Sequence, residues 1–252
     1  VENIAGPLSG KISGIISGGS AAQYLEGVGW IGALRYLDLH LGYWFLIDPL
    51  LEENISFSLT GFPTGEDLTY DFNIPGISLI SFQGDDNSSI GDALPDKIEE
   101  YIPNIIGEGN AATQINGNWY GSLQSLQLGM GYWVTTSQPF SFSWESNGQR
   151  VNHLHSHPVN YNIAPKGFEF NQSTKQAFYF VDEIGLINET FIEDGYVISF
   201  IGETVTGSRI WRGNLVDIPV MGFENNISTS GYAEKGDIPH FKYLMIINSY
   251  KI

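Results

Sequence analysis

The stretch GWIGALRYLDLHLGYWFLI at 29–47 decides the fold, because it returns as NWYGSLQSLQLGMGYWVTT at 118–136. Upstream, IISGGSAAQ at 15–23 matches IIGEGNAAT at 105–113. The longer segments match at a spacing of 89 residues and the shorter ones at 90, so the first copy carries one extra residue between its two blocks. Such a repeat predicts two copies of one structural module. The identical positions at the spacing of 89 are Trp30 and Trp119, Gly32 and Gly121, Leu34 and Leu123, Leu37 and Leu126, Leu39 and Leu128, Gly42 and Gly131, Tyr43 and Tyr132, and Trp44 and Trp133.

The segments around the repeat have clear strand and helix patterns. Alternating apolar and polar residues in ISFSL (55–59) and FSFSW (140–144) predict strands with one buried face. Before the second copy, GISLISF (76–82) is a mostly apolar strand, and SIGDALPDKIEEYI (89–102) has apolar residues at helical spacing. Pro95 should split this helix into two turns, because proline lacks the amide hydrogen that the helix needs.

The two copies differ at their start. VENIAGPLSGKISG at 1–14 aligns with the helical segment of the second copy, so the sequence lacks a counterpart of GISLISF. A sheet without that strand would expose apolar side chains and unpaired backbone groups. We expect a strand from another chain, from a preceding precursor segment, or from FKYLMIINSYKI (241–252) to fill the gap. The alternative is a replacement within the chain, or an open edge.

The remainder of the chain, from about residue 151, lacks the repeat. Its segments QAFYFV (176–181), GYVISFI (195–201), TVTGSRIW (204–211) and FKYLMII (241–247) are rich in aromatic and β-branched residues. Turn residues separate them, so the pattern predicts an all-β unit.

Together these patterns predict a mainly β fold. It consists of an incomplete repeat module at 1–60, a complete module at 61–150 and a C-terminal β unit at 151–252. Each repeat module carries a short helix, and the first lacks its initial strand.

The composition excludes several classes of protein. The 252 residues include 11 Lys and Arg against 28 Asp and Glu, a formal net charge of −17, which argues against nucleic acid as a partner. The absence of cysteine removes disulfides, thiolate metal sites and cysteine nucleophiles. No apolar run approaches the length of a membrane span.

Nine segments in fixed order resemble tandem β-rich modules of large secreted or surface proteins from uncultured marine bacteria. They are LTYDFNIPGISLISF (68–82), IIGEGNAA (105–112), WYGSL (119–123), GYWV (131–134), FEFNQSTKQAFYF (168–180), GSRIW (207–211), DIPVMG (217–222), STSGY (228–232) and GDIPHFK (236–242). The resemblance implies an extracellular or cell-surface location within a multi-module protein. It implies no catalytic residues.

Paired aromatic residues are the first candidates for a ligand site. Trp30, Trp44, Trp119 and Trp133 could stack on sugar rings, because aromatic faces bind the apolar faces of ligands. The competing interpretation is that they are core and corner residues of small two-layer modules.

Histidines and acidic turns are candidates for metal ligands. His153, His155 and His157 in HLHSH would project from one face of a strand, where imidazoles can chelate zinc. The competing interpretation is that these histidines lie in a solvated strand or connector before Pro158, with no carboxylate identified to complete a site. GDD (84–86) and EDG (193–195) could contribute oxygens to calcium, but neither matches an EF-hand loop.

The catalytic templates that we sought are missing, including the GxSxG elbow, HExxH, the phosphate-binding loop and the dinucleotide fingerprint. The sequence therefore favours a non-catalytic extracellular module of a surface-attachment or structural assembly, joined by β-strand complementation to other copies or fragments of the same protein. The alternative is a carbohydrate-binding accessory module of a secreted hydrolase, with polysaccharide as its partner. An enzyme comes third, and no cofactor is expected beyond the calcium or zinc considered above.

Overall fold

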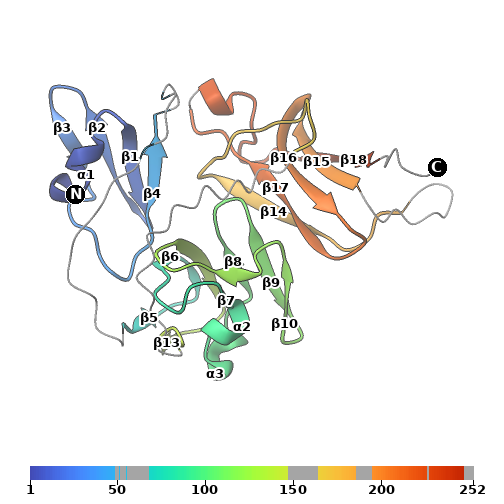
Figure 1. The fold of residues 1–252 in the computed structure, drawn as a ribbon, viewed down its shortest axis with the longest axis horizontal. Coiled ribbons are helices and arrows are strands. Elements are labelled where there is room, and N and C mark those ends of the chain that lie inside the picture. Colours follow the sequence, from blue (N-terminus) through green and yellow to red (C-terminus); the bar gives the residue numbers. More distant parts are fainter. Residues whose placement is uncertain are drawn as a thin grey trace. The chain divides into compact units, whose positions relative to one another are not determined.

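The computed structural model describes residues 1–48, 51, 55, 68–146, 164–185, 195–225 and 227–246. Strands dominate these residues, so the expectation of a mainly β protein is confirmed (Figure 1). The strands of the first repeat are β1 (Ile12–Ser17), β2 (Ser20–Leu25), β3 (Gly29–Gly32) and β4 (Trp44–Ile47).

The first repeat forms an antiparallel sheet in the order β3-β2-β1-β4 (Figure 1). Helix α1 (Glu2–Ala5) and the 3-10 turn η1 (Gly6–Leu8) precede it and contribute Ala5 and Leu8 to its core. The other buried members of this cluster are Ile12, Ile15, Ala22, Trp30 and Leu34. All of them belong to the first repeat, so this repeat has a hydrophobic core of its own.

The second repeat reproduces this strand order and extends it. Its strands are β6 (Gly76–Ser81), β8 (Asn104–Ile106), β9 (Ala111–Ile115), β10 (Asn118–Gly121) and β12 (Gly131–Thr136), in the order β10-β9-β8-β12-β6. Strands β8, β9, β10 and β12 thus follow the order of β1, β2, β3 and β4. β6, the GISLISF segment, is the additional strand, and it pairs with β12 over six residues.

The helical segment of the second repeat is split as expected. Helix α2 (Ile90–Ala93) ends before Leu94, which is extended, and α3 (Asp96–Glu99) begins after Pro95. The residue before a proline avoids helical geometry, so Pro95 explains the break. Ser89 caps α2, because its Oγ accepts a hydrogen bond from the Asp92 amide at 3.1 Å.

The extra residue of the first copy lies in a hairpin loop. Between β2 and β3, three residues connect the paired Leu25 and Gly29. Between β9 and β10, only Asn116 and Gly117 connect the paired strands, with φ of 51° and 78°. Positive φ at both positions is the signature of a two-residue type I′ turn, for which Asn-Gly is the preferred sequence.

The repeats also match in atomic detail. Gly32 and Gly121 have φ of 130° and 133°, and a Cβ on either would collide with the carbonyl oxygen of Ala21 or Ala111, respectively. Each of these oxygens also accepts a hydrogen bond at 3.0 Å, from the amides of Leu34 and Leu123, respectively. The glycines are therefore required by a close backbone approach that both repeats share.

Tyrosine hydroxyls close the same loop in both repeats. The hydroxyl of Tyr43 accepts a hydrogen bond from the Asp38 amide at 2.5 Å. The hydroxyl of Tyr132 accepts one from the Gln127 amide at 2.9 Å. The donating amide lies five residues before the tyrosine in each case. The same hydrogen bond therefore stabilises the equivalent loop in both repeats.

The C-terminal strands are β14 (Gln176–Val181), β15 (Gly195–Ile201), β16 (Thr204–Trp211), β17 (Val216–Met221) and β18 (His240–Met245). The first three have the bounds expected from the sequence. They form a β14-β17 pair and a sheet in the order β16-β15-β18 (Figure 1).

The expected donor role of 241–252 needs correction. Within β18, residues 241–245 pair with β15 of the same chain, from Ser199 opposite Phe241 to Gly195 opposite Met245. Their backbone on that edge is used within the C-terminal sheet. The described part of this segment is therefore not a strand held in reserve for the first repeat.

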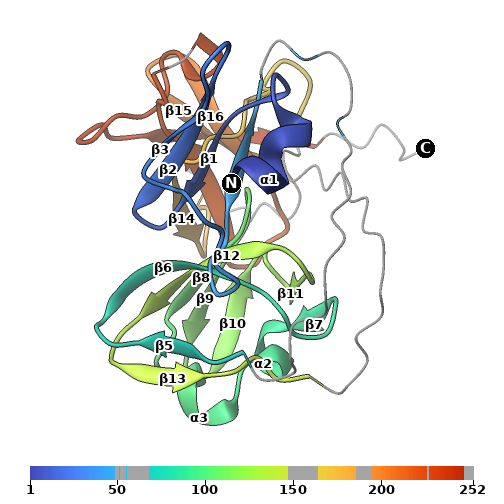
Figure 2. The ribbon, with the colours of Figure 1, turned by 90° about the vertical axis from the view of Figure 1, so that its left-hand side faces the viewer.

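Short pairs complete the fold, with β5 (Tyr70–Phe72) beside β13 (Phe140–Phe142) in Figure 2. Aromatic rings pack here, with centroids 5.5 Å apart for Tyr70 and Phe142 and 4.9 Å apart for Phe142 and Trp144. The remaining elements are β7 (Ser88–Ser89), β11 (Ser125–Leu126) and η2 (Ile227–Thr229).

The chain divides into two compact units. Unit 1 comprises Val1–Ile105 and Ser125–Asn152, and unit 2 comprises Ile106–Gln124 and His153–Ile252. The module boundaries at 1–60, 61–150 and 151–252 describe sequence repeats and stay a prediction. In the part of the chain that the structure describes, no helix has the length and apolar character of a membrane span.

Candidate functional site

The four tryptophans do not form one platform. Trp30 is 9 % exposed and packs on Tyr24 with ring centroids 5.6 Å apart, which is core packing. Trp44 is half-buried on β4, at the opposite end of the order β3-β2-β1-β4, about 14 Å away by strand spacing. Trp119 and Trp133, on β10 and β12, are also half-buried. Sugar binding by these residues stays a prediction.

The metal-site candidates divide into two groups. His153, His155 and His157 lie outside the described residues, as does most of EDG at 193–195. Within the described ranges, no group of three or more His, Asp or Glu could hold a metal ion. Asp85 and Asp86 stabilise their loop instead, since their carboxylates accept hydrogen bonds from the Ser146 hydroxyl at 2.7 Å and the Leu128 amide at 3.0 Å.

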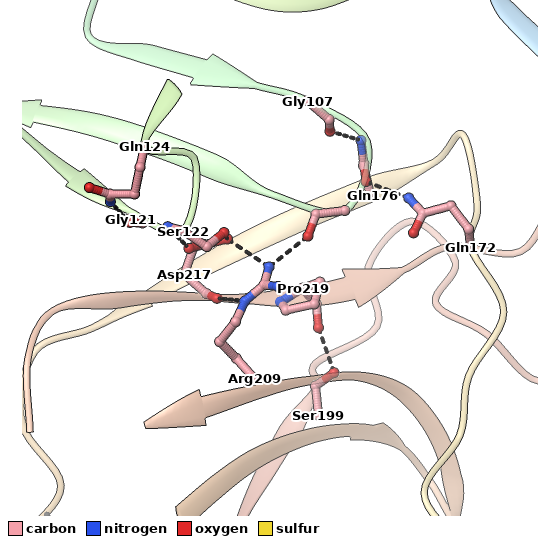
Figure 3. Close-up of polar contacts among 11 residues, drawn as sticks. Gly107, Gly121, Ser122, Gln124, Gln172, Gln176, Ser199, Arg209, Asp217 and Pro219 are labelled. Carbon is pink, nitrogen blue, oxygen red and sulfur yellow. Dashed lines mark hydrogen bonds and ion pairs between the residues drawn. The ribbon is translucent and has the colours of Figure 1, made fainter. Parts of the chain in front are cut away.

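A buried ion pair in unit 2 is the principal charged feature that the sequence patterns missed (Figure 3). Arg209 of β16 and Asp217 of β17 are 7 % and 0 % exposed. One guanidinium nitrogen, Nη2, lies 2.9 Å from Asp217 Oδ2, and Nε donates to the Asp217 carbonyl oxygen at 3.0 Å. The Arg209 side chain thus links β16 to both the side chain and the backbone of Asp217 on β17.

The same pair holds the β9–β10 hairpin, which also belongs to unit 2 (Figure 3). Arg209 Nη2 donates to the Gly109 carbonyl oxygen at 2.6 Å. The Ser122 amide and hydroxyl donate to the two Asp217 carboxylate oxygens at 2.5 and 2.9 Å. We call Arg209, Asp217, Ser122 and Gly109 the hairpin clamp.

Burial governs the electrostatics of the hairpin clamp. Burial raises the pKa of the Asp217 carboxyl, and this desolvation outweighs the opposing effects of Arg209 and of the Ser122 hydrogen bonds. Both charged side chains are buried and form hydrogen bonds within unit 2.

A second feature, in unit 1, brings the two repeats together. The Gly42 amide donates to the Leu79 carbonyl oxygen at 3.1 Å, and the Ser81 amide donates to the His40 carbonyl oxygen at 3.0 Å. Leu41 therefore lies opposite Ile80 in an antiparallel bridge. We call the contact of residues 39–42 with residues 79–81 the repeat junction.

Glycines allow the close approach at the repeat junction. A Cβ on Gly42 would lie 2.9 Å from the Gly131 Cα, and a Cβ on Gly131 would lie 2.9 Å from the Gly42 Cα. Gly42 and Gly131 are equivalent positions of the two repeats. The repeats thus touch at the same residue of each copy.

Side chains reinforce the repeat junction. The Ser81 hydroxyl donates to the Leu39 carbonyl oxygen and lies 2.9 Å from the Tyr70 hydroxyl. The His40 ring packs edge-on against Tyr70, with centroids 5.6 Å apart. The His40 amide and ring also contact Asp38 at 2.8 Å and lower the pKa of its carboxyl.

The repeat junction partly answers the expectation of a missing strand. Residues 40–42 of the first repeat take β6 of the second repeat as their neighbour, so that part of the gap is covered within the chain. Ile77, an apolar residue at the other end of β6, is 65 % exposed. On the edge of β6 that faces away from β12, the described pairing with residues 40–42 reaches Leu79 to Ser81.

The hairpin clamp left one signal in the sequence. Arg209 stands in the apolar strand segment GSRIW and Asp217 in DIPVM, and charged residues inside such strands require partners when buried. The repeat junction left none, because the two hydrogen bonds that pair its segments join backbone groups. Comparison with protein-family models, with curated proteins and with solved structures finds no match to this chain.

Proposed function

We propose that this chain is a non-catalytic structural module of an extracellular or cell-surface assembly whose β modules join through strand pairing. The observation that carries the proposal is the position of β6. It pairs with β12 of its own repeat along one edge and with residues 40–42 of the other repeat along the other edge. Backbone pairing at a sheet edge is a general mode of association between chains.

The character of the buried charges supports a structural role. Arg209 and Asp217 form hydrogen bonds to strands and to a hairpin of the same unit. The extracellular location rests on the resemblance of the nine sequence segments to surface modules. Antibody labelling of intact source cells would test it.

Light scattering of the full chain over a concentration series tests the assembly. We expect the average mass to rise above that of one chain at micromolar concentration. Where chains join through the same strand pairing as the repeat junction, Gly42→Ala should reduce the assembled fraction, because the added Cβ would collide with Gly131. Gly6→Ala is the matched control, since no atom lies within 4 Å of its added Cβ. A monomeric mass at every concentration would contradict the proposal.

Carbohydrate binding is the second candidate, and a pair of exposed rings favours it. Tyr179 of β14 and Phe241 of β18 are 42 % and 37 % exposed, with centroids 5.2 Å apart. Exposed aromatic faces can stack on sugar rings. Pull-down with insoluble polysaccharides should then weaken in Tyr179→Ala but not in Tyr36→Ala, an exposed tyrosine of unit 1. Equal retention of both variants would exclude this surface.

A further inference from the structure

We infer that the repeat junction also closes between two copies of this chain, with residues 39–42 of one copy pairing with β6 of the other. This inference rests on the proposed function and names the partner, a second copy, and the strand that it supplies. A reciprocal exchange would form two repeat junctions and a closed dimer.

The first argument is the chemistry of the contact. Its two backbone hydrogen bonds, Gly42 to Leu79 and Ser81 to His40, depend on extended geometry and not on which chain supplies each segment. The bonds broken in one chain are the same bonds formed between two. Exchange of an identical element is therefore a low-energy route to a dimer.

The second argument is the separation of the cores. Among the described residues, the buried members of the cluster around Ile15 and Trp30 all belong to the first repeat. On the other side, β6 is held to its own repeat by six residue pairs with β12, from Gly131 opposite Ser81 to Thr136 opposite Gly76. β6 would thus move with the second repeat, and the first repeat would keep its core.

The geometry of the repeat junction provides a specific test. The two hydrogen bonds flank Leu41 and Ile80, so these residues form a non-hydrogen-bonded antiparallel pair. Cα atoms in such a pair lie about 4.5 Å apart, which lies within the range that a disulfide bridges. The chain contains no cysteine, so no native thiol can form a disulfide with the introduced cysteines.

The experiment mixes two single variants, Leu41→Cys and Ile80→Cys, refolds them together at micromolar concentration and oxidises them. Each variant has a single cysteine, so neither can form the disulfide within one chain. A disulfide-linked dimer that contains one chain of each variant therefore indicates a repeat junction between copies. We expect its yield to exceed that of a control mixture by at least about fivefold, since pairing raises the effective concentration of the thiols. The control mixes Leu41→Cys with Ile115→Cys, whose thiol would lie on the exposed side of β9.

The double variant Leu41→Cys, Ile80→Cys checks the geometry, and its disulfide should form in the monomer. A mixture that cross-links no better than the control, while the double variant closes within one chain, would overturn the inference. If light scattering still shows assembly in that case, the proposed function survives and only the exchange of β6 is wrong.

A second measurement avoids the substitution of buried Ile80. Unlabelled and ¹⁵N-labelled wild-type chains are refolded together and their masses measured by native mass spectrometry. Dimers of mixed label support the exchange. Monomers alone at micromolar concentration overturn it.

Discussion

The two repeats share their strand order, their strand-ending glycines and their tyrosine hydroxyl bonds, yet they meet β6 in different registers. Tyr132 of the second repeat lies opposite Ile80, whereas in the first repeat Leu41 lies opposite Ile80. The counterpart of Tyr132 is Tyr43, so the first repeat is displaced by two residues. The repeat sequence therefore does not by itself determine where a repeat attaches to β6.

The geometry of a strand allows both repeats to pair with β6. Successive backbone groups point to opposite edges of the sheet. The Phe82 amide donates to Met130 of the second repeat at 2.9 Å, and the neighbouring Ser81 amide donates to His40 of the first. One strand can thus serve two repeats at once, with alternate residues on each edge.

A second difference lies in the hairpins. Ser122, which belongs to the hairpin clamp, occupies the position of Ala33 in the first repeat. Alanine has no hydroxyl that could bind a carboxylate. The two hairpins therefore share a backbone register, but only the hairpin of the second repeat has a hydroxyl at this position that can bind a carboxylate.

The largest expected effect comes from breaking the hairpin clamp. Arg209→Met leaves the Asp217 carboxylate buried without its cation, which should lower the free energy of unfolding by about 3–5 kcal/mol. Urea unfolding followed by tryptophan fluorescence measures the loss. The double variant Arg209→Met, Asp217→Val removes both charges and should recover much of it. A single variant as stable as the wild type would contradict the structural role of the ion pair.

The next largest effect tests the identity of the repeats. Gly32→Ala and Gly121→Ala should each destabilise the protein by about 1–3 kcal/mol from backbone strain, with a further loss from collision with the facing carbonyl oxygen. Chemical unfolding of both variants provides the comparison. Closely similar losses would support equal backbones, whereas tolerance at one site alone would show that the repeats differ there.

A smaller effect is expected at the tyrosine hydroxyls. Tyr43→Phe and Tyr132→Phe each remove one hydrogen bond to a backbone amide, and each should lower the unfolding free energy by about 1 kcal/mol. Thermal unfolding at several protein concentrations separates this loss from any change in assembly. A neutral result in both variants would show that water replaces the hydroxyl.

The smallest effect concerns pH. The pKa of Asp217 is raised in the folded state, so the folded protein retains a proton there at a pH where the unfolded chain has lost it. Its contribution to stability is full below the unfolded pKa and is lost as pH rises through the folded pKa. Asp217→Asn should remove this dependence, and its stability relative to the wild type should increase as pH rises. Unfolding curves at several acidic and neutral pH values test this, and a difference of opposite slope would contradict it.

Local patterns determined much of this protein. The repeat indicated two modules of one strand order, the apolar runs of the C-terminal part gave the bounds of β14, β15 and β16, and Pro95 divided the helix. These features are encoded by neighbouring residues, through alternation, helical spacing and the missing proline amide hydrogen. For the same reason they can be read without knowledge of distant contacts.

Only the tertiary structure decided which distant groups meet. Arg209 reaches Gly109 across 100 positions, and Ser122 reaches Asp217 across 95. The pairing of β18 with β15 was also decided by the tertiary structure, because strands pair through backbone geometry. The repeat junction belongs to the same class, since backbone hydrogen bonds carry no residue identity and become visible only when the chain has folded.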